Sequence, residues 1–155
     1  MSPHQEVAEM LVKALRATSL ASGSARVERT YGVKDFLGSH DDNTTTRIAV
    51  MVSSVESQRE GPVRNDDVTL SIIYFRRLDK GAAMDAMDKA DENVEALRVW
   101  LEEPEQKRIV LIQNAGRSAS RINTTLPTPY SAEHARTQDN FAAVVQTTYQ
   151  LTRVL

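Results

Sequence analysis

The clearest pattern in the chain is a strand followed by a helix. Apolar and polar residues alternate over 68–76, with branched and aromatic side chains at most positions, which predicts a core β-strand. Gly81 predicts a tight turn, and beyond it apolar residues recur at steps of three and four, which predicts an amphipathic helix over 83–103. We expect this helix to pack on the sheet that contains the strand. Its predicted apolar stripe consists of Met84, Met87, Ala90, Val94, Leu97 and Leu101.

Shorter periodic segments predict one more helix and four more strands. Ser2 and Pro3 are typical of a helix start, and a narrow apolar stripe follows as far as about residue 17. Val27 and Tyr31 are the expected buried positions of the first strand, which resembles an edge strand because charges fill its other positions. The four strands are predicted over 26–33, 47–55, 108–113 and 140–154.

Polar segments rich in turn residues separate these elements. We predict loops over 34–46 and 56–67 and a polar connection over 117–140. The strands on either side of 56–67 should pair as an antiparallel hairpin. Loops of this length are more often functional or disordered than merely connecting, so we expect 36–46 and 56–67 to be mobile in the free subunit.

Together these elements predict one α+β domain over residues 1–155. The predicted order is α-β-β-β-α-β-β. We expect a mainly antiparallel sheet of about five strands, with both helices packed on one face of it.

The composition changes this prediction little, but it excludes some functions. The chain has 155 residues and a formal net charge of −2, and a dedicated nucleic-acid binder would usually carry a clear basic excess. It has no cysteine, so disulfides and thiolate metal sites are excluded. The longest apolar runs, such as 48–52, are too short to cross a bilayer, and we expect no membrane partner.

Candidate catalytic and metal-binding residues do not form a recognisable motif. The three histidines, at positions 4, 40 and 134, lack the close spacing of metal ligands on one helix. The acidic turn at Asp41 lacks the spacing of a calcium-binding loop, and Ser118 and Ser120 have no nucleophile-elbow context. We therefore expect no catalytic residue, no cofactor and no metal site.

The charged residues are distributed unevenly along the chain. Acids dominate over 79–105, and bases dominate from Lys107 onward. A molecule with one acidic and one basic surface can pack head-to-tail on copies of itself, and such contacts close into rings when the rotation allows. An ordinary solvated surface is the alternative explanation. The candidate subunit interface consists of Asp85, Asp88, Glu92 and Glu95 on the acidic side and Arg117, Arg121 and Arg136 on the basic side.

The order of elements resembles that of the tail terminator (tail-completion) proteins of long-tailed bacteriophages. The segments that carry the resemblance are 7–15, 46–75 with its polar loop, 83–101 and 141–151. The resemblance implies a structural virion protein without catalytic residues. It implies a homo-oligomeric ring, a hexamer, that caps the tail tube and provides the head-tail joining surface. The implied partners are the tail tube protein and a head-connector protein, with DNA only passing through the ring. Assembly in the host cytoplasm and a final position at the head-tail interface of the virion follow from the same resemblance.

Two other functions remain open at this point. One is a different phage neck or connector component, or a baseplate adaptor, of similar build. The other is a small enzymatic or ligand-binding α+β domain, whose pocket would lie between the 83–103 helix and the sheet. The predicted stripe of that helix is filled by methionine and leucine, which indicates packed core rather than a cavity.

Overall fold

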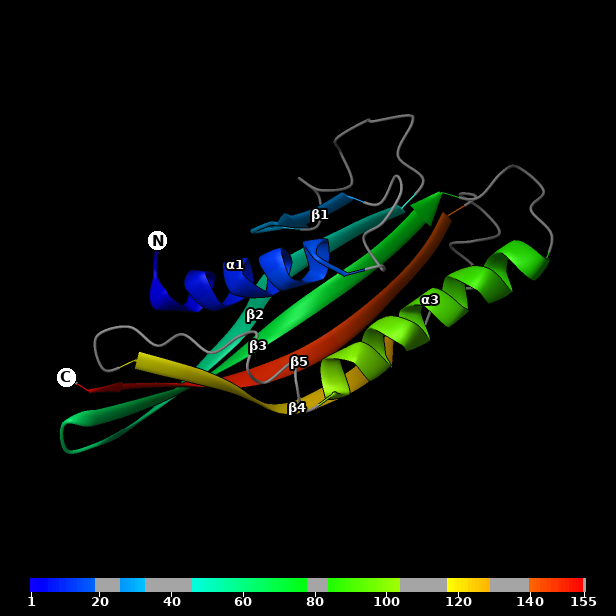
Figure 1. Ribbon diagram of the computed structural model, residues 1–155. Helices are drawn as coiled ribbons and strands as arrows, with labels where there is room; N and C mark the ends of the chain where they lie inside the picture. The colour runs from blue at the N-terminus through cyan, green and yellow to red at the C-terminus, as the bar shows by residue number, and fades with distance from the viewer. Residues whose placement is uncertain (19–25, 33–45, 78–83, 104–116, 129–139, 155) are drawn as a thin grey trace.

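The computed structural model describes residues 1–18, 26–32, 46–77, 84–103, 117–128 and 140–154 (Figure 1). The side chains of β4 are outside this description. The described elements are α1 (Pro3–Arg16), β1 (Arg26–Arg29), β2 (Thr46–Glu60), β3 (Val63–Arg77), α3 (Met84–Glu102), β4 (Arg117–Thr128) and β5 (Asn140–Val154). The α+β class is therefore confirmed, and the first five predicted elements and the last one appear in the predicted order. The sixth observed element, β4, is not the strand predicted over 108–113.

The strands described here form one five-stranded sheet in the order β1-β2-β3-β5-β4. Three of its neighbouring pairs are antiparallel, including the expected β2–β3 hairpin, but β1 runs parallel to β2. The sheet is thus mixed, and the predicted antiparallel sheet agrees with it only roughly. A parallel pair needs a crossover of about a dozen residues or more, which the long segment between β1 and β2 can supply.

Both helices lie on one face of the sheet (Figure 1). Val7, Leu11 and Leu15 of α1 and Leu97 of α3 belong to the same buried cluster as the inward residues of β2, β3 and β5. Burial of such side chains contributes roughly 1.5–3 kcal/mol each, so this layer is the main source of stability. The Asn93 amide of α3 also donates a hydrogen bond to the Tyr74 hydroxyl of β3, at 3.2 Å.

The start of α1 follows the predicted capping chemistry. The Ser2 hydroxyl accepts a hydrogen bond from the Gln5 backbone N–H at 3.3 Å, and Pro3 occupies the first turn. At the other end of the helix, the Arg16 guanidinium donates two hydrogen bonds to the Val27 carbonyl, at 3.0 and 2.9 Å. These contacts join α1 to the edge strand β1.

The prediction of a polar loop over 56–67 is wrong. β2 and β3 continue through this segment in register, from Glu56 opposite Asp67 to Glu60 opposite Val63. Gly61, with a φ of 58°, makes the turn between them. The segment lacks an apolar alternation because all β2 side chains from residue 53 onward are exposed, so its strand structure rests on backbone pairing rather than burial.

Three other predictions need correction. The segment 117–140, predicted as a polar connection, contains the strand β4. This strand pairs with β5 through its backbone, and its sequence shows no apolar alternation that would predict it. Tyr31 is 73% exposed, since β1 ends at Arg29, and the Arg29 guanidinium lies over its ring at 5.2 Å. Met84 is 76% exposed because it is the first residue of α3.

Some predictions lie outside the described residues. These are the strand over 108–113, the loop over 34–46 except Thr46, and the turn at Gly81. The last strand is confirmed with its bounds, Asn140–Val154, and its predicted inward residues are buried. Among the described residues, neither helix is long and apolar enough to cross a membrane.

Candidate functional site: the arginine row at the hairpin end

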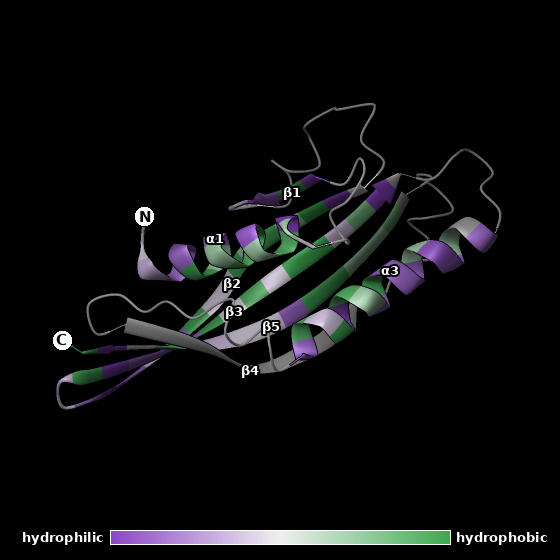
Figure 2. Ribbon diagram, viewed as in Figure 1, coloured by the Kyte–Doolittle hydropathy of each residue, from purple (hydrophilic) through white to green (hydrophobic). Residues whose placement is uncertain are grey.

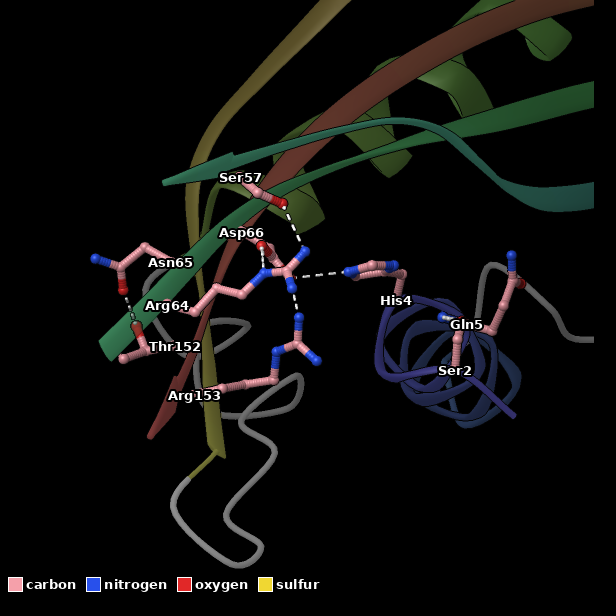
Figure 3. Close-up of polar contacts among 9 residues, drawn as sticks. All are labelled: Ser2, His4, Gln5, Ser57, Arg64, Asn65, Asp66, Thr152 and Arg153. Carbon is pink, nitrogen blue, oxygen red and sulfur yellow. Dashed lines mark hydrogen bonds and ion pairs between the residues drawn. The ribbon is translucent and has the colours of Figure 1, made fainter. Parts of the chain in front are cut away.

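A buried carboxylate lies near the end of the sheet where β2 and β3 meet at their turn. Asp66 of β3 is fully buried and faces the helix side (Figure 3). Its Oδ2 accepts hydrogen bonds from His4 Nε2 at 2.9 Å and from an Arg153 nitrogen at 2.6 Å. Its Oδ1 accepts from Arg64 Nε at 3.1 Å, and a second Arg64 nitrogen donates to the Ser57 hydroxyl at 3.3 Å. One carboxylate thus holds side chains from α1, β3 and β5.

The environment keeps Asp66 ionised. Burial on its own raises the pKa of this carboxyl, because it penalises the charged form. The Ser57 hydroxyl, His4, Arg64 and Arg153 oppose that effect, and together they hold the pKa well below its usual range. Asp66 therefore acts as a fixed anionic anchor for two arginines.

The register places further arginines beside this anchor. Arg59 of β2 pairs with Arg64 of β3, Arg64 pairs with Arg153 of β5, and Arg153 pairs with Arg117 of β4. Directly opposite residues in neighbouring antiparallel strands lie on the same face of a sheet. We call Arg59, Arg64 and Arg153 the arginine row, and the backbone of Arg117 is in register with its last member. The row crosses three adjacent strands, and Asp66 is the carboxylate that contacts two of its members.

A β-bulge brings Arg59 into this row. Val52 pairs with Leu70 and Ser54 pairs with Thr69, so Ser53 is an extra residue on β2. The Ser53 hydroxyl donates to the Thr69 carbonyl at 3.1 Å, which gives the bulged residue a partner. Because side chains alternate between faces along a strand, the extra residue decides which face each later residue of β2 occupies.

The acidic residues predicted for the interface lie on the exposed side of α3. Asp85, Asp88, Glu92 and Glu95 are all exposed, and their spacing of three and four residues places them along one side of the helix. We call these four residues the acidic stripe. Arg98 donates to Glu95 at 2.9 Å and to Glu102 at 3.0 Å, and the hydrogen bond from Arg98 lowers the pKa of Glu95. Within the described residues, the other three acids of the stripe form no ion pair.

The predicted basic residues are only partly placed. The backbone of Arg117 is in register with Arg153, and that of Arg121 is in register with Tyr149, while Arg136 lies outside the described residues. The group formed by Arg59, Arg64, Asp66 and Arg153 was not predicted from the sequence. One available signal was that Asp66 is in phase with the inward residues 68, 70 and 72 of the same strand.

A half-open hollow lies between the start of α3 and the start of β5. It has a volume of about 220 Å³ and is lined by Met84, Met87, Asp88, Asp91 and Phe141. This volume is below the roughly 300–1,000 Å³ of typical small-molecule sites.

Among the described residues, no group of three or more histidine and carboxylate side chains is arranged to hold a metal ion. His4 contacts Asp66, and the other two histidines lie outside the described residues.

No protein-family model matches this chain, and a search of curated proteins finds no relative.

Proposed function

We propose that this chain is a ring-forming tail terminator of a long-tailed bacteriophage. In this role it caps the tail tube and provides the surface that joins the tail to the head. The role is structural rather than enzymatic, and its partners are copies of itself, the tail tube protein and a head-connector protein. DNA passes through the ring, and the protein is part of the virion after assembly in the host cytoplasm.

One observation carries this proposal: a row of arginines lies on the helix-side face of the hairpin end, and a stripe of acids lies on the exposed side of α3. The arginine row crosses the hairpin end of the sheet, and the acidic stripe begins at the far end, where α3 starts (Figure 1). Such a molecule favours head-to-tail contacts between different surfaces of two copies, and these contacts generate rings when the rotation closes. The element order, with both helices on one face of the sheet, supports the same proposal.

Mass photometry of the purified chain tests ring formation. We expect a hexameric species that becomes more populated as the ionic strength falls, because exposed charges are screened by salt. Antibody labelling of the native particle in electron micrographs tests the position of the protein. Label at the junction of head and tail is the expected result. A protein that is strictly monomeric, even within its particle, would contradict the proposal.

The same labelling separates the related structural roles. A different neck or connector component would be labelled on the head side of the junction, and a baseplate adaptor would be labelled at the distal tip of the tail. Either result would replace the terminator role while leaving a ring-forming protein.

The hollow beside α3 favours a second candidate function, a small ligand-binding domain. Two carboxylates, Asp88 and Asp91, line it together with Met84, Met87 and Phe141, so it would suit a small cationic and partly apolar molecule. Thermal-shift measurements with a panel of small amines test this function. If an amine raises the melting temperature of the parent but not that of an Asp91→Ala variant, the result would support ligand binding over the ring-forming role.

A further inference from the structure

We propose that the acidic stripe of one copy of this chain binds across the arginine row of the next copy. This inference deepens the proposed ring and rests on it. It assigns the basic side of the subunit contact to Arg59, Arg64 and Arg153 in line with Arg117. Arg121 and Arg136, predicted from charge counts alone, are not needed for it.

The two surfaces match in length. The acidic stripe runs from Asp85 to Glu95 of α3, a separation of ten residue steps or about 15 Å at the helical rise per residue. The arginine row crosses three neighbouring strands and continues by register to the backbone of Arg117 on a fourth, so these positions span about 14 Å. Successive acids on a helix face and successive arginines across strands are both roughly 5 Å apart, so neighbouring charges on the two surfaces have the same spacing.

The arginine row is already oriented for a partner. Asp66 holds Arg64 through Nε and Arg153 through a terminal nitrogen, so both guanidiniums are fixed before any partner binds. Arg64 is still 40% exposed, and the Arg59 guanidinium donates to the Gly61 carbonyl at 3.1 Å, its single hydrogen bond to the described part of the chain. Charged groups that are positioned in advance lose less conformational entropy when they bind.

The acids of the stripe are equally available. Asp85, Asp88 and Glu92 are exposed and have no cationic partner within the described residues. In the row, Arg59 is exposed and Arg64 is 40% exposed, while Arg153, which shares Asp66 with His4 of α1, is 18% exposed. An acidic helix from outside can therefore lie along the row.

Nucleic acid is the other polyanion that a row of arginines could bind. The second copy is favoured because this chain presents its own acidic partner of matching length, and because its net charge is −2. A broad basic surface, which nonspecific DNA binding needs, would give a clear positive excess. Duplex DNA is therefore an outcome to be tested rather than the partner we propose.

Charge reversal at one residue on each side tests the contact. Arg59→Glu changes an exposed residue that does not touch Asp66, and Asp88→Arg changes an exposed residue of the stripe. Each variant should weaken self-association about tenfold, because an attraction between exposed charges becomes a repulsion. The double variant R59E/D88R should recover to within about threefold of the parent, since the charges are exchanged across the contact. Lys13→Glu, an exposed residue on α1, is the matched control and should leave self-association unchanged.

Mass photometry over a range of salt concentrations is the readout, with thermal unfolding of each variant as the check on folding. If the parent forms rings and R59E assembles as well as K13E, this inference is wrong and the proposed function stands. If the parent forms no ring in solution or in its particle, the proposed function itself fails. Fluorescence anisotropy with a 20-base-pair duplex completes the test. Loss of duplex binding in R59E, with unchanged self-association, would assign the row to nucleic acid and overturn the inference.

Discussion

The middle of the sheet and its hairpin end are built by the same three strands, with the bulge at Ser53 between them. In the middle, Val50, Ile72 and Val145 lie opposite one another and are fully buried beneath the helix layer. At the hairpin end, Arg59, Arg64 and Arg153 occupy the equivalent positions. Figure 2 shows the strands change from mainly hydrophobic to mainly hydrophilic toward the turn.

The difference between the two regions lies in how each row is stabilised. The apolar row gains its free energy from burial, which needs no particular partner atoms. The arginine row depends on one carboxylate, Asp66, which must accept hydrogen bonds from several cations at once. The middle should therefore tolerate changes of apolar shape, and the hairpin end should tolerate no change of charge at Asp66.

The largest effect is expected in the middle. Leu97 is 1% exposed, so Leu97→Asp places an unpaired charge in the core and should cost several kcal/mol of unfolding free energy, roughly 3–5. Val99 of the same helix is 45% exposed, and Val99→Asp should change stability by about 0.5 kcal/mol or less. Urea denaturation measures both. A folded, equally stable L97D protein would show that the buried face of α3 is assigned incorrectly.

The next effect is expected at the hairpin end. Asp66→Ala removes the acceptor of Arg64, Arg153 and His4, and should cost about 2–4 kcal/mol because the two arginines are left without their carboxylate. Asp67 is the matched control, since its strand position faces the other side of the sheet from the Asp66 cluster. Equal stability of D66A and D67A would contradict the role of Asp66 as an anchor.

Acid should weaken the hairpin end before it weakens the middle. The pKa of Asp66 is lower in the folded protein than in the unfolded chain, where it is about 3.9. Its contribution is therefore fully present above the unfolded pKa and is lost as the pH falls toward the folded pKa. Unfolding free energies measured between pH 5 and pH 2 should fall less steeply for Asp66→Asn than for the parent. Parallel curves would mean that Asp66 has an ordinary pKa.

The smallest effect concerns the contact between α1 and the hairpin end. His4→Ala removes one of the hydrogen bonds to Asp66 and should cost about 1 kcal/mol. Lys13→Ala, at an exposed position of the same helix, should have no measurable effect. Amide exchange can locate the change, which we expect in the first turn of α1 and in β3 near Asp66. Exchange that increases only elsewhere would contradict the contact.

The apolar part of the fold could be predicted from sequence because burial has a period. The stripes over 83–103 and 140–154 gave a helix and a strand whose bounds agree with the structure to within one residue. The same logic failed over 56–67 and 117–128, where the strands carry polar side chains and are held by backbone hydrogen bonds to a neighbour. Such pairing leaves no periodic trace in a single sequence.

The candidate site was less predictable than the fold. The acidic stripe lies on one continuous helix, so the helical spacing of Asp85, Asp88, Glu92 and Glu95 was sufficient to find it. The arginine row is assembled from three different strands, and its register depends on the bulge at Ser53. No local pattern records that register.

The bulge at Ser53 also limits how the hairpin can change in length. Deleting this one residue would turn Val55, Ser57 and Arg59 to the opposite face of the sheet, although Ser53 itself is not part of the arginine row. Insertions and deletions between Ser54 and Glu60 should therefore survive selection only in pairs, matched by pairs on β3. The hairpin can become longer or shorter in steps of two residues on each strand, because only an even change keeps the arginines on the same face of the sheet.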